Sequence, residues 1–470
     1  MGSPSLIEMV FAFLLVLGPL ILLHELGHFL VAKRAGIRAL EFGMGYPPRA
    51  RKLWRGTGYV VVDGVRFETP RNFELPWDWL IYPNKAVTLT YDEVNGKALA
   101  RSLELAPAVE AALLQPPAAP AGQQALTVKI DNQAVAVAPL PPAPRRRNVT
   151  MQRGAHEISG VVNELDAGTE YTLNWLPIGG FVRMWGEEGA EGKGSFNNAP
   201  KRWRAATLLA GPGMNLLIAF VVFTATYMLG YPESPAVIEE VAAGSPAAVA
   251  GLQPQDAIVA VDDLPIRNIA QVKPYIDEHA GQPVNVTVLR DGQNLVFEVT
   301  PRTVSQTPEG QGKLGIAFNV AAASGYKLVQ HPLGESIQLA VSDIADTVRQ
   351  IVTLPTRLLA QQMAPSEAQV VGPVGISQYA AAAVNQTAST GELFWFLNLF
   401  AAISLALAIT NLLPLPALDG GQIVFAFVEM VRGRAVKPRL IWRVQMIGFS
   451  FMVVLFLVLT FNDLLRKIGR

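Results

Sequence analysis

Cysteine is absent from the 470-residue sequence, which excludes a disulfide framework, a thiolate metal site and a cysteine nucleophile. Charge is also scarce, because 16% of the residues are charged, whereas an ordinary soluble domain carries about 25%. The 38 basic and 38 acidic residues sum to zero, so the chain as a whole has no electrostatic attraction to nucleic acid. Half of the residues are hydrophobic. This composition indicates a membrane protein with soluble parts.

Four apolar stretches are long enough to cross a bilayer, which takes about 20 residues of helix. They run from 6 to about 32, from about 205 to 229, from 393 to about 415 and from about 440 to 461. The first has no basic residue before its apolar run, which favours a retained span over a signal peptide. Lys and Arg cluster beside the spans in 33–204 and 430–443. These segments are therefore expected to be cytoplasmic, with 231–392 and both termini external.

The segments between the spans differ in character. Four strand-like runs lie at 236–241, 257–261, 284–290 and 295–300, and the last two flank Asp291-Gly292, a hairpin signal. Residues 335–361 place apolar positions at helical spacing, which predicts an amphipathic helix at the membrane surface. In the cytoplasmic segment, 59–100 and 125–175 contain strand-like patches, whereas 107–147 is rich in Ala and Pro and is interpreted as a loop or linker.

The motif HELGH at 24–28 is the strongest chemical signal. On a helix, positions i and i+4 share one face, so His24 and His28 can bind one Zn²⁺, with Glu25 beside them as a general base. Ionisable residues inside a span are costly and indicate function. The alternative is a pair of core histidines satisfied by hydrogen bonds. The three other histidines stand alone in polar contexts and are interpreted as solvated: His156, His279 and His331.

A catalytic zinc site usually takes three protein ligands. Asp419 follows the third span and is expected at its cytoplasmic end, where the histidine pair also lies, because the two spans run in opposite directions. The alternative for Asp419 is a cap of the next helix. Asn215 and Asn411 carry amides that could bind water, a substrate carbonyl or freed backbone groups, or could simply join helices.

HELGH, GPGMN at 211–215 and LPALDGG at 415–421 together resemble the site-2 protease family of intramembrane zinc metalloproteases. The likeness is strongest to the bacterial regulator of sigma-E protease type, which has one external PDZ domain. Residues 171–184 resemble its membrane-associated β-hairpin, and 245–252 resemble the opening of bacterial PDZ domains. Two features depart from the family: an insertion of about a hundred residues precedes the hairpin, and Gln255-Asp256 stands where the PDZ turn usually reads Gly-Asp.

The resemblance implies a polytopic α-helical membrane protein with about four transmembrane helices, a membrane-associated β-hairpin, an external PDZ-like α/β domain and a cytoplasmic insertion. The expected divisions are 1–56 (first transmembrane helix with HELGH and the following loop), 57–165 (cytoplasmic insertion), 166–204 (hairpin and approach to the second span), 205–230 (second transmembrane helix), 231–325 (PDZ domain), 326–392 (amphipathic helix and linker), 393–429 (third transmembrane helix and LDG motif) and 430–470 (cytoplasmic loop and fourth transmembrane helix).

By the same resemblance, His24, His28 and Asp419 bind Zn²⁺, Glu25 activates water, and the two asparagines position the substrate or stabilise the oxyanion. A strand at 171–184, with Gly179 and Gly180 at its tip, could hold an extended substrate by strand addition.

The expected function is zinc-dependent cleavage of single-pass membrane proteins, such as anti-sigma factors or signal-peptide remnants, in the bacterial inner membrane. The expected partners are these substrates, the lipid bilayer and peptide C-termini at the PDZ domain, without nucleic acid. Three alternatives remain. They are an inactive membrane PDZ scaffold, a metal transporter, for which no internal repeat is found, and a membrane zincin whose third ligand is a glutamate.

Overall fold

The computed structural model describes residues 4–75, 82–94, 96–107, 129–130, 133–134, 156–187, 192, 194–233, 236–267, 269–308, 311–318, 327–359, 372–434 and 436–468. The chain forms two compact units, one of residues 28–207 and one of residues 1–27 with 208–470. Two helices each contain residues of both units: α1 (Leu6–Arg34) and α3 (Lys201–Leu229).

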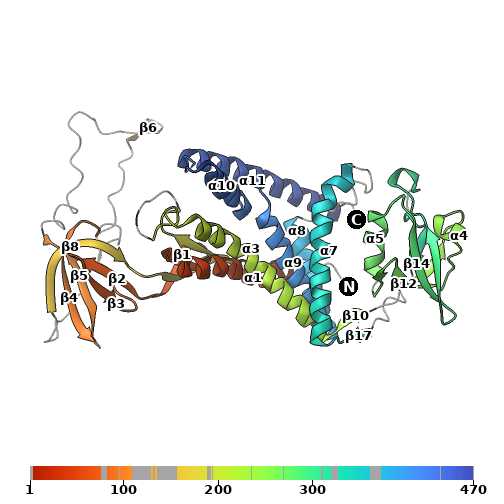
Figure 1. Cartoon of the computed structure of the whole chain (residues 1–470), viewed down its shortest axis with the longest axis horizontal. Coiled ribbons are helices and arrows are strands. Elements are labelled where there is room, and N and C mark those ends of the chain that lie inside the picture. Colours follow the sequence, from red (N-terminus) through yellow and green to blue (C-terminus); the bar gives the residue numbers. More distant parts are fainter. Residues whose placement is uncertain are drawn as a thin grey trace. The chain divides into compact units, whose positions relative to one another are not determined.

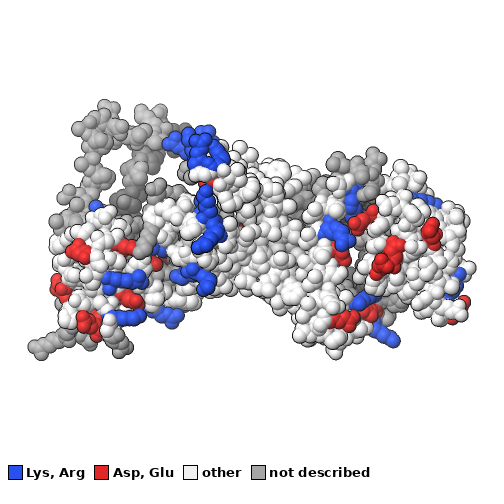
Figure 2. All heavy atoms as spheres, in the orientation of Figure 1, with Lys and Arg blue, Asp and Glu red and all other residues white. Residues whose placement is uncertain are grey.

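Four helices among the described residues are long and apolar enough to cross a membrane, as the sequence predicts. They are α1, α3, α9 (Phe394–Leu412) and α11 (Pro438–Ile468) (Figure 1). On the face shown in Figure 2, the surface over these helices carries almost no charged side chains, whereas Lys and Arg gather where α10 (Asp419–Arg432) is followed by α11. Helix α9 ends earlier than predicted because Pro414 and Pro416 follow it.

Two further helices pack against the spans. Helix α7 (Leu333–Leu359) confirms the predicted amphipathic helix, and its buried face packs on α3 and α9 through Ala340. Helix α8 (Pro373–Thr390) was expected only as linker; its Ala380 and Ala381 lie in one apolar cluster with Met9, Ala12, Val16 and Leu20 of α1. The carboxylate of Asp463 on α11 accepts hydrogen bonds from the backbone N–H groups of Gly372 and Gly375, so it caps the N-terminus of α8.

The chain after α3 forms a small β-rich body with its own core. Its sheet has the order β15-β14-β12-β11-β16, with β13 paired to β12. The strands are β11 (Ala236–Val241), β12 (Ala257–Val261), β13 (Leu264–Pro265), β14 (Val284–Arg290), β15 (Gln293–Val299) and β16 (Ile316–Phe318). Two short helices accompany the sheet, α4 (Pro246–Ala250) and α5 (Val272–Glu278). A separate pair, β10 (Tyr231–Glu233) and β17 (Lys327–Val329), lies where this body joins the helices.

Turn chemistry explains two features of this body. Asp291 and Gly292 both have positive φ, which is the requirement of the tight hairpin that joins β14 to β15 and confirms the predicted turn. Gln255 also has positive φ, at 75°, where glycine would be free of strain. Its backbone N–H still donates to the Ile238 carbonyl at 2.8 Å, so the turn forms despite the substitution.

Strands β1 (Ala39–Arg55) and β9 (Glu170–Met184) form an interleaved sheet, whereas 171–184 was expected to form a membrane-associated β-hairpin. Strand β9 does reverse near Gly179, whose φ is 64°. However, its arms pair with β1, because Phe42 faces Val182 on one side and Tyr171 on the other. The later part of β1 then pairs antiparallel with the first arm of β9, from Arg49↔Asn174 to Arg55↔Glu170. The hairpin prediction was therefore wrong about pairing, because a segment far earlier in the sequence inserts between the two arms.

Most of the described part of the 57–165 insertion forms a closed β-barrel with the strand order β2-β3-β5-β4-β8 (Figure 1). The strands are β2 (Gly58–Val62), β3 (Val65–Thr69), β4 (Ala86–Val94), β5 (Lys97–Leu105) and β8 (His156–Asp166). Val60, Phe67, Tyr82, Leu89 and Leu103 are among the side chains that fill its core. The strand-like patches are thus confirmed. The interpretation of 107–147 as a loop falls outside the described residues, apart from Pro107 and the short strands β6 (Lys129–Ile130) and β7 (Gln133–Ala134).

Candidate metal centre

The two histidines of HELGH lie one turn apart on the uninterrupted helix α1, and both are buried. Glu25 is half-buried beside them. Gly27 completes the local requirement, because a Cβ there would come within 2.3 Å of the carbonyl oxygen of Ala210 on α3. The motif therefore combines two imidazoles on one face with a small residue that lets the second helix approach closely.

Asp419 was expected at the end of the third span, but it is the first residue of α10. It nevertheless reaches the histidines, because its Oδ2 lies 3.0 Å from Nε2 of His24. The glycines after it make this possible: a Cβ at Gly420 would meet the Leu413 carbonyl oxygen at 2.1 Å, and one at Gly421 would meet the Leu415 carbonyl oxygen at 2.4 Å. The LDGG motif thus folds α10 tightly against the segment that leaves α9.

His24, His28 and Asp419 each offer a ligand atom, and these atoms all lie within 4.8 Å of one another. Within the described parts of the chain, they form the one group of three or more such side chains close enough to share an ion. Two imidazole nitrogens with one carboxylate oxygen are a donor set that suits Zn²⁺, which accepts nitrogen and oxygen ligands. The residues present therefore fit a zinc ion.

The far nitrogens of both rings meet partners on α3. Nδ1 of His28 lies 2.7 Å from the carbonyl oxygen of Thr207, and Nδ1 of His24 lies 3.3 Å from the amide nitrogen of Asn215. Ser404 on α9 donates to the backbone carbonyl of Asn215 at 2.8 Å. Sequence reasoning missed Thr207 and Ser404; a backbone carbonyl contact leaves no pattern in the sequence.

The other predicted site residues are not part of this cluster. Asn411 lies in the last turn of α9 and is partly exposed. Gly179 forms the bend of β9, and Gly180 pairs with Met44 of β1. Their predicted contacts with a substrate stay predictions.

The side chain of His331 is only 8% exposed, so its interpretation as a solvated histidine was wrong. Its Nδ1 lies 3.2 Å from Glu335 and its Nε2 3.5 Å from Glu233, while its ring packs edge-on against Tyr227. The hydroxyl of Tyr227 donates to Asp343 on α7. Burial and the nearby Asp343 raise the pKa of Tyr231 to about 12. His156, in contrast, is exposed, and His279 is half-buried against Tyr275.

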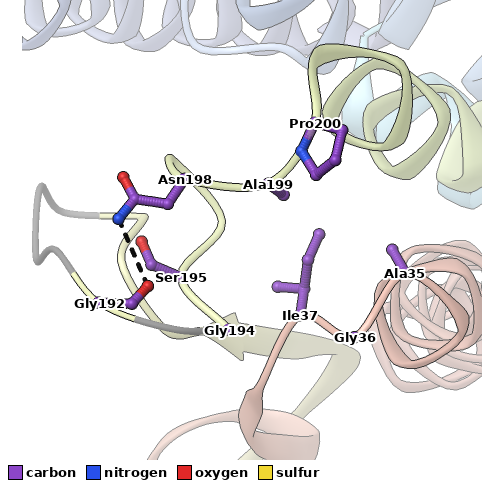
Figure 3. A pocket seen from close by; sticks show the side chains of 9 residues that line it. All are labelled: Ala35, Gly36, Ile37, Gly192, Gly194, Ser195, Asn198, Ala199 and Pro200. Carbon is purple, nitrogen blue, oxygen red and sulfur yellow. Dashed lines mark hydrogen bonds between the residues drawn. The ribbon is translucent and has the colours of Figure 1, made fainter.

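A pocket of about 490 Å³ opens where α1 ends and α3 begins, lined by 35–37 and part of 192–200 (Figure 3). The Asn198 side chain donates to the Gly192 carbonyl at its rim, and Pro200 borders it just before α3. None of the lining residues is ionisable. Among the described residues, the pocket therefore offers space beside the helix ends without an ionisable side chain in its lining.

The sequence matches the family model described as peptidase family M50 over residues 12–62 and 150–455. The chain belongs to peptidase family M50. The matched residues include Glu25 and all three candidate ligands, whereas 63–149, which carries β3 to β7, lies outside the match. Membership in M50 confirms the likeness to the site-2 proteases and makes this protein a metalloprotease.

Several curated proteins are similar to this M50 chain over much or nearly all of its length. The zinc metalloprotease RasP of Bacillus licheniformis is 28% identical, covering 97% of this chain and 99% of the relative. The regulator of sigma-W protease RasP of Bacillus subtilis is 27% identical over 98% of this chain and 99% of the relative. The metalloprotease MmpA of Caulobacter vibrioides is 29% identical over 64% of this chain and 83% of the relative.

Proposed function

We propose that this protein is a zinc-dependent intramembrane endopeptidase that cleaves single-pass membrane proteins, such as anti-sigma factors or signal-peptide remnants. The observation that carries the proposal is the convergence of His24, His28 and Asp419 from two separate helices. The similarity to RasP, named as a regulator of a sigma factor, supports the substrate class. The intact ligand set argues against an inactive scaffold.

The proposed roles follow from the positions of the side chains. His24, His28 and Asp419 hold the ion, which when bound supplies Lewis-acid activation of water and of the scissile carbonyl. Glu25, one position after the first ligand, takes a proton from the attacking water and later returns it to the leaving amine. Asn411 and the bend at Gly179 and Gly180 contact the substrate backbone.

The proposed orientation places the ligand-bearing helix ends toward the cytoplasm of a bacterial inner membrane and the β-rich body of 231–325 outside. The basic residues from the end of α10 to the first turns of α11 support this, because Lys and Arg favour the cytoplasmic side: Arg432, Arg434, Lys437, Arg439 and Arg443. The external body would act as a PDZ domain that excludes bulky substrates or binds peptide C-termini. The second arm of β9, at the edge of its sheet, would hold the unwound substrate by strand addition.

The decisive experiment is Glu25→Gln in purified protein with a model single-pass substrate. This change removes the general base and keeps the size of the side chain. Cleavage is expected to fall by about 10²–10⁴-fold, the usual contribution of general acid–base catalysis, while bound zinc stays at the wild-type level.

A matched control is Glu8→Gln, the same change at an exposed acid in the first turn of α1. This variant should cleave like the wild type. Wild-type cleavage by Glu25→Gln would overturn the mechanism, and zinc-free wild-type protein with full activity would overturn the metal assignment.

A further inference from the structure

Asn215 has an unusual environment for a residue expected to touch substrate. Its side chain is fully buried on α3, and its amide nitrogen faces Nδ1 of His24 at 3.3 Å. Its amide oxygen is buried without a hydrogen-bond partner. A buried polar atom that lacks a partner carries a cost of roughly 1–3 kcal/mol and calls for a physical explanation.

The two histidines show what that explanation is. A neutral imidazole carries its proton on one nitrogen and a lone pair on the other, and a metal ligand must present the lone pair. For His28, the Thr207 carbonyl can only accept a hydrogen bond, so it places the proton on Nδ1 and leaves Nε2 for an ion. His24 needs an equivalent acceptor at its own Nδ1.

As the side chains lie here, the amide of Asn215 presents its donor to His24. That arrangement assigns the lone pair to Nδ1 and the proton to Nε2, where the Asp419 carboxylate accepts it at 3.0 Å. A half turn of the Asn215 amide reverses the assignment. The orphaned oxygen then accepts the Nδ1 proton of His24, and Nε2 becomes free to bind an ion beside Nε2 of His28 and the carboxylate.

We propose that Asn215 is a positioning residue for His24: its amide oxygen holds the Nδ1 proton in the metal-loaded site and so fixes the ring as a ligand. The inference rests on the proposed function, because it takes His24 as a zinc ligand. It gives Asn215 a different role from the substrate contact that the family resemblance implies. Ser404 supports the arrangement by anchoring the backbone of Asn215 to α9.

Zinc affinity of the purified protein, measured by competition with a chromophoric chelator, tests this role without relying on activity. Asn215→Leu keeps the size of the side chain and removes the acceptor, and its zinc affinity should be about 10–100-fold weaker, as for other outer partners of ligating histidines. Asn215→Asp can only accept when ionised, and it should bind zinc within a few-fold of the wild type. Asn215→Ala provides a second apolar variant in case leucine does not fit.

Thr226→Val is the matched control, because it removes another buried polar group, a hydroxyl, from the same helix. Thermal unfolding of the metal-free variants separates loss of the ligand from loss of the fold. Equal zinc affinity for Asn215→Leu, Asn215→Ala and the wild type would overturn the inference, as would an equally weakened Asn215→Asp. A wild type that binds zinc no better than a His28→Ala variant would instead overturn the proposed function.

Discussion

Two groups of buried polar side chains lie along α3, and both contain histidine. Near the middle of the helix, Asn215 meets His24 beside Asp419; at its end, Tyr227 meets His331 and Asp343. Burial alone does not distinguish the groups. The groups differ in which atoms their ring nitrogens and carboxylates face.

In the first group, ligand atoms from α1 and α10 converge, and the far side of each ring is held by a group on α3. In the second group, His331 lies between Glu233 and Glu335, and Glu335 is also 3.4 Å from Arg267. In this group the polar side chains contact one another, and the Tyr227 hydroxyl donates to the nearby Asp343 carboxyl. The first group is therefore arranged to bind an ion, and the second to join α3, α7 and the chain that enters the β-rich body.

The largest effect is expected when one of the candidate metal ligands is replaced. Asp419→Asn removes the negative charge from the first group, so zinc affinity should fall by more than the roughly 10–100-fold that loss of an outer partner costs. Cleavage of a model substrate should be lost with it. Zinc content after dialysis and competition with a chelator measure the effect.

Asp463→Asn is the matched control, because Asp463 is a buried aspartate that caps α8 rather than facing the histidines. It should lower the thermal stability and leave zinc affinity unchanged. The contrast between the groups would be wrong if Asp419→Asn and Asp463→Asn lowered the zinc affinity equally.

A smaller effect is expected from the second group. Tyr227→Phe removes the hydroxyl that donates to Asp343, leaving a buried carboxylate without that donor. The free energy of unfolding should fall by about 1–3 kcal/mol, while zinc affinity stays at the wild-type value. Thermal unfolding in detergent, with and without zinc, measures both quantities.

Tyr379→Phe serves as the comparison, since Tyr379 is exposed on α8 and its loss of a hydroxyl should change stability little. A drop in zinc affinity for Tyr227→Phe would show that the two groups are coupled through α3, and the separation argued above would then be wrong.

Local patterns explain why much of this fold could be predicted. The four spans follow from length and apolarity, the strands of the β-rich body from alternation, and α7 from its 3.6-residue period. The histidine pair followed from i, i+4 spacing, and its nearness to Asp419 from the opposite directions of two spans. The predicted closeness of Asp419 to the histidines was right although Asp419 begins α10, because the glycines allow that helix to pack against the end of α9.

The missed features depend on contacts between distant parts of the sequence. The pairing of Phe42 with Tyr171 joins segments far apart in the chain, and no local pattern specifies which strand inserts between the arms of β9. Helix α8 has a short alanine-rich face whose burial depends on α1. His331 stands between Gln330 and Pro332, outside any periodic apolar pattern, so its burial appears only when α3 and α7 come together.

The smallest expected effect is a change in pH dependence at Asp343. Burial raises the pKa of this carboxyl above its ordinary value, although the Tyr227 hydrogen bond opposes the shift. A raised folded-state pKa contributes stability that is complete below the unfolded value of about 3.9 and is lost as the pH rises through the folded value. Asp343→Asn removes this titration and keeps an acceptor for Tyr227.

The melting temperature of Asp343→Asn relative to the wild type should therefore increase from about pH 4 toward neutral pH and then level off. Glu298→Gln, the equivalent change at an exposed position of β15, should show no such trend. A constant difference for Asp343→Asn would mean that the carboxyl does not lose stability on ionising. The contrast between the two groups along α3 would then rest on geometry alone.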